Sequence, residues 1–256
     1  MKFMQLRNAT AKIEYAGKRF LIDPVLAEKW AYPAFEGTIN AHLCNPLVDL
    51  PVPIEAMLDV DAVIVTHTHL DHWDEAAKKL IPKEIRIFAQ NEKDAAEIRE
   101  AGFRDVTILT EQTNFAGITL TKTHGQHGSD EAMAKLGDRL GAVCGVIFLH
   151  PEEKTLYLAG DTVWNRHVSD NLQKHAPDVI VLNSGDAQII GLGSIIMGKK
   201  DVYEVCQAAP SATIIASHME AMNHAVLSRK ELRDFLKENG MIQRVLVPED
   251  GESCVL

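Results

Sequence analysis

The sequence predicts an α/β fold, because short apolar runs and amphipathic segments alternate along most of its length. The short runs are rich in β-branched residues and indicate strands, whereas the longer segments carry apolar residues three and four positions apart and indicate helices. With 256 residues and 46% hydrophobic content, the chain can bury a large core. A single α/β domain spanning residues 1–256 accounts for this length.

The expected elements follow from these two periodicities. We expect strands at residues 2–7, 11–16, 18–22, 62–66, 85–89, 106–109, 118–123, 142–149, 154–159, 178–183, 212–216, 243–247 and 252–256. We expect helices at residues 74–80, 91–101, 164–175, 199–209 and 227–238. Leu232, Phe235 and Leu236, for example, share one helical face.

The run THTHLDHWD, from Thr66 to Asp74, follows one of these strands and is rich in metal-ligand side chains. His67 and His69 are two residues apart in extended chain, so their imidazoles share a face and can bind one ion. The next turn carries Asp71 and His72 toward a second position. A mixed carboxylate and imidazole set suits zinc, manganese or iron better than calcium or magnesium. The alternative is a solvated helix start capped by Asp71 or Asp74.

An HxHxDH motif after a buried strand resembles the signature of the metallo-β-lactamase superfamily. The resemblance implies a four-layer αβ/βα sandwich, in which two facing mixed sheets are flanked by helices and bind one or two metals at their edge. It also implies three further ligands in a set order: a His, an Asp and a final His, each at the end of a strand. The chain has a candidate for each.

The first downstream ligand has two candidates, His124 and His127, in a Gly-rich turn after the strand at 118–123. In the branch that includes ascorbate-6-phosphate lactonases and N-acylphosphatidylethanolamine phospholipases, the ligand follows a T-x-x-x-H pattern, which Thr123 to His127 matches. We therefore assign His127 as the ligand. His124 is then a group that orients a ligand or faces the substrate, or simply a turn histidine.

The remaining two ligands follow the strands at 154–159 and 212–216. Asp161, in Ala-Gly-Asp-Thr, matches the bridging Asp of the family, although an Asp in this position is otherwise a helix cap. His218 matches the final His. His224, six residues later, suits a substrate contact or a proton donor, with a helix-start histidine as the alternative.

The resemblance extends to the start of the chain and covers residues 1–256. Residues 11–24 resemble the opening hairpin of the branch, with its turn at Gly17 and a final Asp23-Pro24 dipeptide. Asp23 is expected to brace a metal-bound His through a hydrogen bond. Coverage of this extent favours one domain with no separate appendage.

Residues 25–53 break the alternation of strands and helices and are too long for an ordinary connection. They contain Trp30, Tyr32 and Phe35 as well as four prolines. The family resemblance implies that this insertion lies near the metals, as a lid whose aromatic residues contact the substrate. The alternatives are a packing flap and a dimer contact. A Gly-rich loop at 185–198 is the candidate for the opposite wall, with Asp186 and Gln188 as polar contacts.

Composition narrows the classes of partner. A formal net charge of −10 disfavours nucleic-acid binding. The N-terminal residues lack a signal-peptide pattern and no segment reaches membrane-spanning length, so we expect a cytoplasmic protein with no membrane association. The four cysteines are scattered without C-x-x-C spacing, which predicts free thiols. The sequence leaves open whether the chain forms a homo-oligomer.

The ligand set implied by the resemblance predicts a metal-dependent hydrolase with two divalent ions, zinc foremost and otherwise manganese or iron. A bridging hydroxide would attack a lactone carbonyl or a phosphodiester of a small cytoplasmic metabolite. We assign catalytic roles to Asp71 and Asp161, which are also ligands, and to His224. Arg166 is the nearest candidate for contacting a phosphate. The alternative is a sensor that keeps the fold without catalysis, whereas the di-iron oxidoreductases of the superfamily carry a Glu and a flavin domain that this chain lacks.

Overall fold

The computed structural model describes residues 1–256, and its first sheet is built mainly from the N-terminal half. In the sheet order, the strands are β16 (Ser253–Val255), β1 (Lys2–Arg7), β2 (Thr10–Tyr15), β3 (Lys18–Ile22), β4 (Ala62–Val65), β5 (Arg86–Ala89) and β6 (Val106–Ile108). Strands β3 to β6 are parallel, and the others pair antiparallel, so the sheet is mixed. A two-residue turn at Ala16 and Gly17, both with positive φ, joins β2 to β3.

The second sheet comes from the remainder of the chain. In order, its strands are β15 (Val245–Leu246), β14 (Thr213–Ser217), β11 (Val179–Asn183), β10 (Leu156–Leu158), β9 (Cys144–Leu149), β8 (Ile118–His124) and β7 (Thr113–Phe115). Strands β10, β11, β14 and β15 are parallel, and the rest are antiparallel. Both sheets therefore combine a hairpin region with a parallel region.

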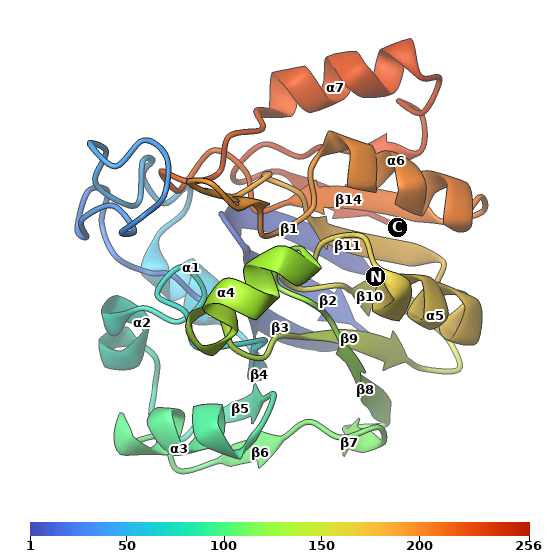
Figure 1. Cartoon of the computed structure of the whole chain (residues 1–256). Helices are drawn as coiled ribbons and strands as arrows, with labels where there is room; N and C mark the ends of the chain where they lie inside the picture. The colour runs from blue at the N-terminus through green and yellow to red at the C-terminus, as the bar shows by residue number, and fades with distance from the viewer.

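Helices cover the outer faces of both sheets (Figure 1). On the first sheet lie α1 (Ile54–Leu58), α2 (Glu75–Leu80) and α3 (Glu92–Glu100). On the second sheet lie α5 (Arg166–His175), α6 (Lys199–Ala208) and α7 (Arg229–Glu238), whereas α4 (Asp130–Leu140) packs with a small hairpin formed by β12 (Gln188–Ile189) and β13 (Gly193–Ser194). The predicted four-layer αβ/βα sandwich is confirmed.

The alternation of side chains along each central strand divides the core into layers. In β4, Ala62 and Ile64 point between the sheets, whereas Val63 and Val65 pack under the first helical layer. In β11, Val181 likewise points between the sheets while its neighbours face α5 to α7. Strands buried on both faces need apolar residues at every position, which explains the continuous apolar runs that the sequence contains.

Several short or irregular elements were not predicted from the sequence. Helix α4 was not expected from the sequence, and Gly137 within it lowers helix propensity. In the structure the helix is kinked at Leu136, whose dihedral angles are not helical. Helix α1 has five residues and β7 has three, which are too few to carry a periodic pattern. The insertion at residues 25–53 breaks the alternation as predicted, because it forms no strand or helix before α1 and makes only isolated bridges.

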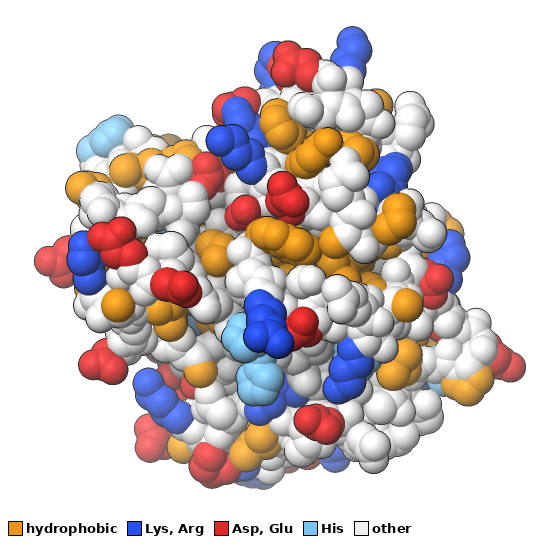
Figure 2. Space-filling view, turned by 45° about the vertical axis from the view of Figure 1, so that its right-hand side comes forward, with side chains coloured by type: hydrophobic (Ala, Val, Ile, Leu, Met, Phe, Trp, Pro, Cys, Tyr) orange, Lys and Arg blue, Asp and Glu red, His pale blue; other side chains and the backbone are white.

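None of the helices combines the length and the apolar character needed to cross a membrane. The cysteines are free, as predicted. On the face drawn in Figure 2, acidic and basic side chains are interspersed, and no single basic patch dominates it.

Candidate metal centre

Strand ends bring all of the predicted ligands to one edge of the two facing sheets. The segment after β4 carries His67, His69, Asp71 and His72, the turn after β8 carries His127, the turn after β10 carries Asp161, and β14 is followed by His218. A turn, in which the amides of His72 and Trp73 donate to the His69 carbonyl, swings the second half of the motif inward. Asp74 caps α2 through its side chain, so Asp71 is free to face the site.

The donor atoms form two adjacent groups. The three-histidine cluster comprises His67, His69 and His127, and the mixed cluster comprises Asp71, His72, Asp161 and His218. Within each cluster, one donor atom per residue lies within 4.8 Å of all the others. His67 Nε2 lies 3.0 Å from His69 Nδ1, and His72 Nε2 lies 3.2 Å from His218 Nε2. Such convergence of nitrogen lone pairs is the arrangement that a metal ion requires.

Asp161 belongs to the mixed cluster but also lies close to the three-histidine cluster. Its Oδ2 is 3.1 Å from His72 Nε2, 3.7 Å from His127 Nε2 and 3.9 Å from His67 Nε2. Asn183 Nδ2 donates to its Oδ1 at 2.7 Å and fixes the carboxylate plane. A carboxylate in this position can contact an ion in either cluster, which fits the bridging role that the family resemblance implied.

The imidazole nitrogens that point away from the clusters are, with one exception, bonded to acceptors or hydroxyls. His127 Nδ1 lies 2.9 Å from the Ile195 carbonyl oxygen, and His69 Nε2 lies 3.2 Å from that of Arg139. His72 Nδ1 lies 2.9 Å from Asp23 Oδ2, as predicted for Asp23. An acceptor on the outer nitrogen keeps the proton there and leaves the inner nitrogen free for a metal. The residues present therefore fit a metal ion, and the exception is His218 Nδ1, which has no partner.

The electrostatics of the site also favour a cation. Burial disfavours charge on His72, but Asp161 and Asp23 outweigh it and raise the pKa of this imidazole well above its ordinary value. Burial likewise opposes ionisation of Asp161, yet His72 and His218 hold the pKa of this carboxyl well below its usual range. Burial together with His72 and His69 lowers the pKa of His67, which stays neutral as a ligand must. Asp161 and Asp23, whose negative charges stabilise a proton on the buried His72 imidazole, would in the same way stabilise the positive charge of a bound metal ion.

Two residues of the site, one ligand and one residue that contacts a ligand, have a strained backbone conformation. His218 and Asp23 both have positive φ, at 60° and 42°. Glycine accommodates the close approach beside them, because a Cβ on Gly185 would collide with the His218 carbonyl oxygen. Non-glycine residues adopt this conformation at some energetic cost, and they do so most often at functional sites.

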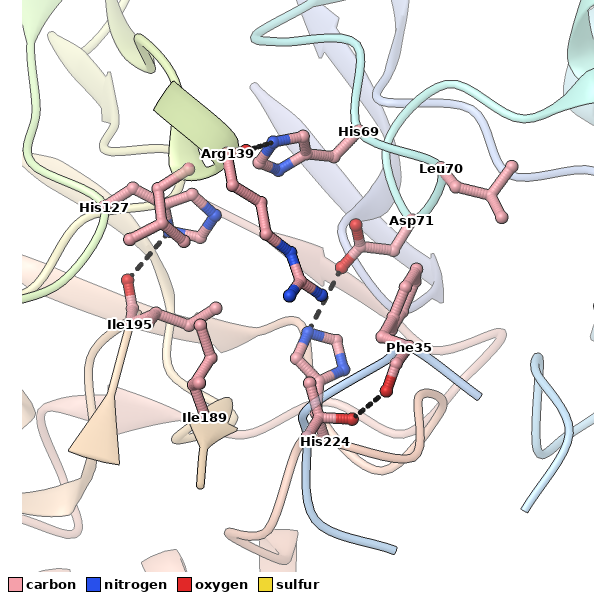
Figure 3. A pocket seen from close by; sticks show the side chains of 11 residues that line it. Phe35, His69, Leu70, Asp71, His127, Arg139, Ile189, Ile195 and His224 are labelled. Carbon is pink, nitrogen blue, oxygen red and sulfur yellow. Dashed lines mark hydrogen bonds and ion pairs between the residues drawn. The ribbon is translucent and has the colours of Figure 1, made fainter. Parts of the chain in front are cut away.

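A cavity of about 300 Å³ opens beside the clusters (Figure 3). It is lined by Phe35, Thr38, His69, Leu70, Asp71, His127, Arg139, Leu140, Ile189, Ile195 and His224. The polar members include three ligands, whereas the walls are mostly aliphatic or aromatic. Arg139 is the cationic residue of the lining, and its guanidinium extends across the cavity toward His224 in Figure 3. Its Nη2 donates to the Glu36 carbonyl oxygen on the far side.

His224 lies in this cavity rather than in either cluster. Its Nε2 is 3.7 Å from Asp71 Oδ2, and its Nδ1 is buried without a partner. Burial lowers the pKa of His224 to about 4, although Asp71 opposes the shift. The predicted catalytic residues Asp71, Asp161 and His224 therefore lie together.

Five substrate contacts were predicted outside the Gly-rich loop, and of these only Phe35 lines the cavity. Trp30 is 63% exposed, and the Tyr32 hydroxyl donates to Asp74 at 3.3 Å. His124 is exposed at the end of β8, beside His167. The Arg166 side chain is 90% exposed and pairs with Asp170 on α5. Trp30 and Tyr32 were assigned as aromatic residues of the insertion, and His124 and Arg166 because they adjoin ligand motifs. None of these four residues lines the cavity.

Several residues of the site had no recognisable sequence signal. Arg139 lies on α4, which was not predicted, and Asn183 is one of many polar residues that end a strand. In contrast, the Gly-rich loop was predicted as the opposite wall, and two of its residues, Ile189 and Ile195, line the cavity. Asp186 in that loop instead accepts bonds from Gln188 and Ser194.

Comparison with known proteins agrees with this architecture. The model of the beta-lactamase superfamily domain matches residues 18–219. UPF0173 protein YddR of Bacillus subtilis (strain 168) is 55% identical over 254 residues, which span 99% of each chain. The crystal structure of isothiocyanate hydrolase from Delia radicum gut bacteria aligns with a TM-score of 0.98 and 52% identity, covering 100% of this chain and 99% of that one. N-acyl-phosphatidylethanolamine-hydrolyzing phospholipase D 1 of Caenorhabditis elegans is 26% identical over 174 residues, which are 61% of this chain and 45% of that protein.

The sandwich fold and its compact His/Asp metal-binding cluster define a metal-dependent hydrolase with the metallo-β-lactamase fold. The chain belongs to the beta-lactamase superfamily and, within it, to the UPF0173 family of metal-dependent hydrolases. The family predicted from the HxHxDH motif is therefore confirmed.

Proposed function

We propose that this protein hydrolyses small isothiocyanates, using two divalent metal ions held by His67, His69, Asp71, His72, His127, Asp161 and His218. The observation that carries the proposal is a largely apolar cavity of about 300 Å³ that opens onto the ligands. Its size suits a small organic substituent. The similarity of the whole chain to an isothiocyanate hydrolase, at 52% identity, supports this substrate class.

The reaction adds water across a heterocumulene carbon. The water oxygen bonds to the central carbon of R–N=C=S, while the electron pair of the C=N π bond moves to nitrogen, which takes up a proton. The resulting thiocarbamic acid breaks its C–N bond, the pair leaves with nitrogen, and the hydroxyl proton transfers to it. The products are the amine R–NH₂ and carbonyl sulfide, so no oxidant or reductant is consumed.

Divalent ions in these clusters would supply Lewis acidity and lower the pKa of water, with zinc as the foremost choice and manganese or iron as alternatives. Asp161 and Asp71 orient the attacking water through their carboxylate oxygens. The His224 imidazole faces the same space and donates a hydrogen bond to the substrate nitrogen as charge develops there. Arg139 directs further N–H donors at the cavity from α4.

Leu70, Leu140, Ile189 and Ile195 surround the reacting centre with apolar surface and exclude bulk water. Exclusion of water strengthens each electrostatic contact with the developing charge. The same walls bind the substituent R by burying its apolar surface. A charged substituent would be bound poorly there, because it would lose its hydration and find only Arg139 as a cationic partner in the lining.

A second candidate is the cleavage of a lactone or a phosphodiester of a small cytoplasmic metabolite. Arg139 supports it, because a guanidinium is suited to binding a phosphate oxygen. The partial match to a phospholipase D supports the phosphodiester in particular. The mainly apolar lining favours the isothiocyanate.

The test is multiple-turnover hydrolysis of benzyl isothiocyanate, followed by release of benzylamine, with protein reconstituted separately with zinc and with manganese. A lactone panel and a phosphodiester chromogen are run in parallel. Isothiocyanates also modify thiols, and Cys44 is exposed, but that reaction consumes at most one equivalent at this residue. Amine release over many equivalents is expected, and it should vanish in Asp161→Ala.

Cleavage of a lactone or a phosphodiester without amine release would replace the isothiocyanate by the second candidate. Binding of metal without turnover of any of these substrates would favour the non-catalytic sensor.

A further inference from the structure

The buried side chain of Arg7 forms hydrogen bonds to both ends of the insertion at residues 25–53. Arg7 in β1 donates to the carbonyl oxygens of Val25 and Ala27 at 2.9 and 2.8 Å, and to that of Val48 at 3.0 Å. These bonds join the two ends of the insertion to the first sheet. The insertion therefore starts and finishes on rigid structure.

The middle of the insertion is held by Asn223, in the loop between β14 and α7. Asn223 Nδ2 donates to Thr38 Oγ1 and to the Ile39 carbonyl oxygen, both at 2.8 Å. Its Oδ1 accepts from Asn45 Nδ2 at 2.8 Å and from the Phe35 amide at 3.3 Å. Both donor hydrogens and both lone pairs of the amide are thus occupied.

The Asn223 backbone completes the same network. Its amide donates to Asn45 Oδ1 at 2.8 Å, and its carbonyl accepts from Asn40 Nδ2 at 3.1 Å. Asn223 is only 1% exposed. A buried polar group with every bond made gives its surroundings one defined arrangement, because any alternative leaves a polar atom unpaired.

Two residues of this hydrogen-bond network also line the cavity. Phe35 and Thr38 both line it, and both are bonded to Asn223. The ring of Phe35 meets the His224 imidazole edge to face, with centroids 4.8 Å apart, and His224 is the residue after Asn223. The labelled side chains of Phe35 and His224 lie together on one side of the cavity in Figure 3. One loop thus supplies a group next to the metal ligands and also positions the wall that faces the substituent.

We infer that Asn223 is a positioning residue for substrate selectivity, which holds Phe35 and Thr38 as a fixed wall that favours a compact aromatic substituent. This inference rests on the proposed isothiocyanate hydrolysis and deepens it by naming the substituent. A fixed aromatic face binds a flat ring by edge or offset contacts with little loss of conformational entropy. A long flexible chain loses more freedom in the same space.

A double-mutant cycle in selectivity tests the inference. For the wild type, Asn223→Ala, Phe35→Ala and the double variant, kcat/KM is measured for benzyl and methyl isothiocyanate. Asn223→Ala is expected to lower the benzyl-to-methyl ratio about tenfold, mainly through KM for the benzyl compound. Because Asn223 acts through Phe35, the benzyl-to-methyl ratio of the double variant should be no lower than that of Phe35→Ala. Asn239→Ala removes one side-chain bond at the end of α7 and should keep the wild-type ratio.

Hydrogen exchange gives a readout that does not depend on the substrate. Amides of residues 35–45 should exchange faster in Asn223→Ala, whereas those of β4 and β14 keep their protection. Asn223→Asp serves if the alanine variant does not fold, because it keeps both acceptor bonds and removes the donors to Thr38 and Ile39.

Additive effects in the cycle, or unchanged exchange at residues 35–45, would overturn the role of Asn223. If the wild type releases no amine from either isothiocyanate, the proposed function fails. The exchange experiment then still decides whether Asn223 holds the insertion in place.

Discussion

The three-histidine cluster and the mixed cluster lie side by side, but their surroundings differ. In the first, His69 is partly exposed to the cavity, and the outer nitrogens of His69 and His127 contact neutral backbone carbonyls. In the second, all four residues are buried, and the outer nitrogen of His72 contacts the carboxylate of Asp23. The three-histidine cluster thus faces the cavity with two of its ligands and lacks a carboxylate, whereas the mixed cluster faces it with Asp71 alone and contains two carboxylates.

This difference indicates a division of labour between the two clusters. A carboxylate on the outer nitrogen raises the basicity of an imidazole ligand more than a carbonyl does. We therefore infer that the mixed cluster binds its ion more tightly, and that the three-histidine cluster meets the substrate. Four substitutions or treatments separate these roles.

Removing Asp161 should have the largest effect, because its carboxylate serves both clusters. We expect Asp161→Ala to lose bound metal at both and to lower kcat/KM by at least about 10³-fold. Metal analysis and steady-state kinetics on the same preparation measure the two effects. Asp170→Ala, on the exposed face of α5, is the matched control. Retention of two ions in Asp161→Ala would refute the bridging role.

Chelation should release the two ions in sequence. The first should leave the three-histidine cluster with loss of activity and little change in Tm, because that cluster opens to the cavity. The second should leave the buried mixed cluster and lower Tm, since an ion present at a hundred times its Kd stabilises the folded state by about 2.7 kcal/mol. A chelator titration followed by activity, metal content and calorimetry distinguishes this order from simultaneous release.

Asp23→Asn should weaken one cluster selectively. The amide keeps the shape of the side chain but removes the negative charge next to His72, so we expect a loss of roughly 10- to 100-fold in metal affinity at the mixed cluster. Competition with a coloured chelator measures both sites. Equal weakening of the two sites would show that Asp23 acts through the fold, because its Oδ1 also accepts a bond from the Thr66 amide.

Arg139→Met should have the smallest effect and act on the open side only. The substitution removes the donor to Glu36 and the cation of the cavity, while the Arg139 backbone carbonyl still contacts His69. We expect KM for benzyl isothiocyanate to rise about fivefold, with metal content unchanged, as for the loss of one charge-assisted hydrogen bond at a partly solvated site. A fall in metal content instead would mean that the side chain supports His69.

Much of the metal centre followed from local sequence pattern. The residues His67, His69, Asp71 and His72 follow a strand whose continuous apolar residues predict its burial. Asp161 and His218 repeat that arrangement, so each ligand could be assigned from its own neighbourhood with the family resemblance. His127 was assigned over His124, in the same turn, only through the T-x-x-x-H pattern of the resemblance, and the structure places His127 in the three-histidine cluster.

The sequence by itself determined the alternation of strands and helices and the residues that follow each strand, because these are local properties. The layered sandwich and the full ligand set followed from the resemblance of these motifs to a known family. The tertiary structure alone decided the cavity, since its walls come from residues 35–38, 139–140, 189–195 and 224, which are far apart in the chain. Arg139 depends on a kinked helix with weak propensity, and the contacts of Asn223 join loops that no periodicity connects. Long-range packing, rather than local preference, therefore selects the substrate-facing surface.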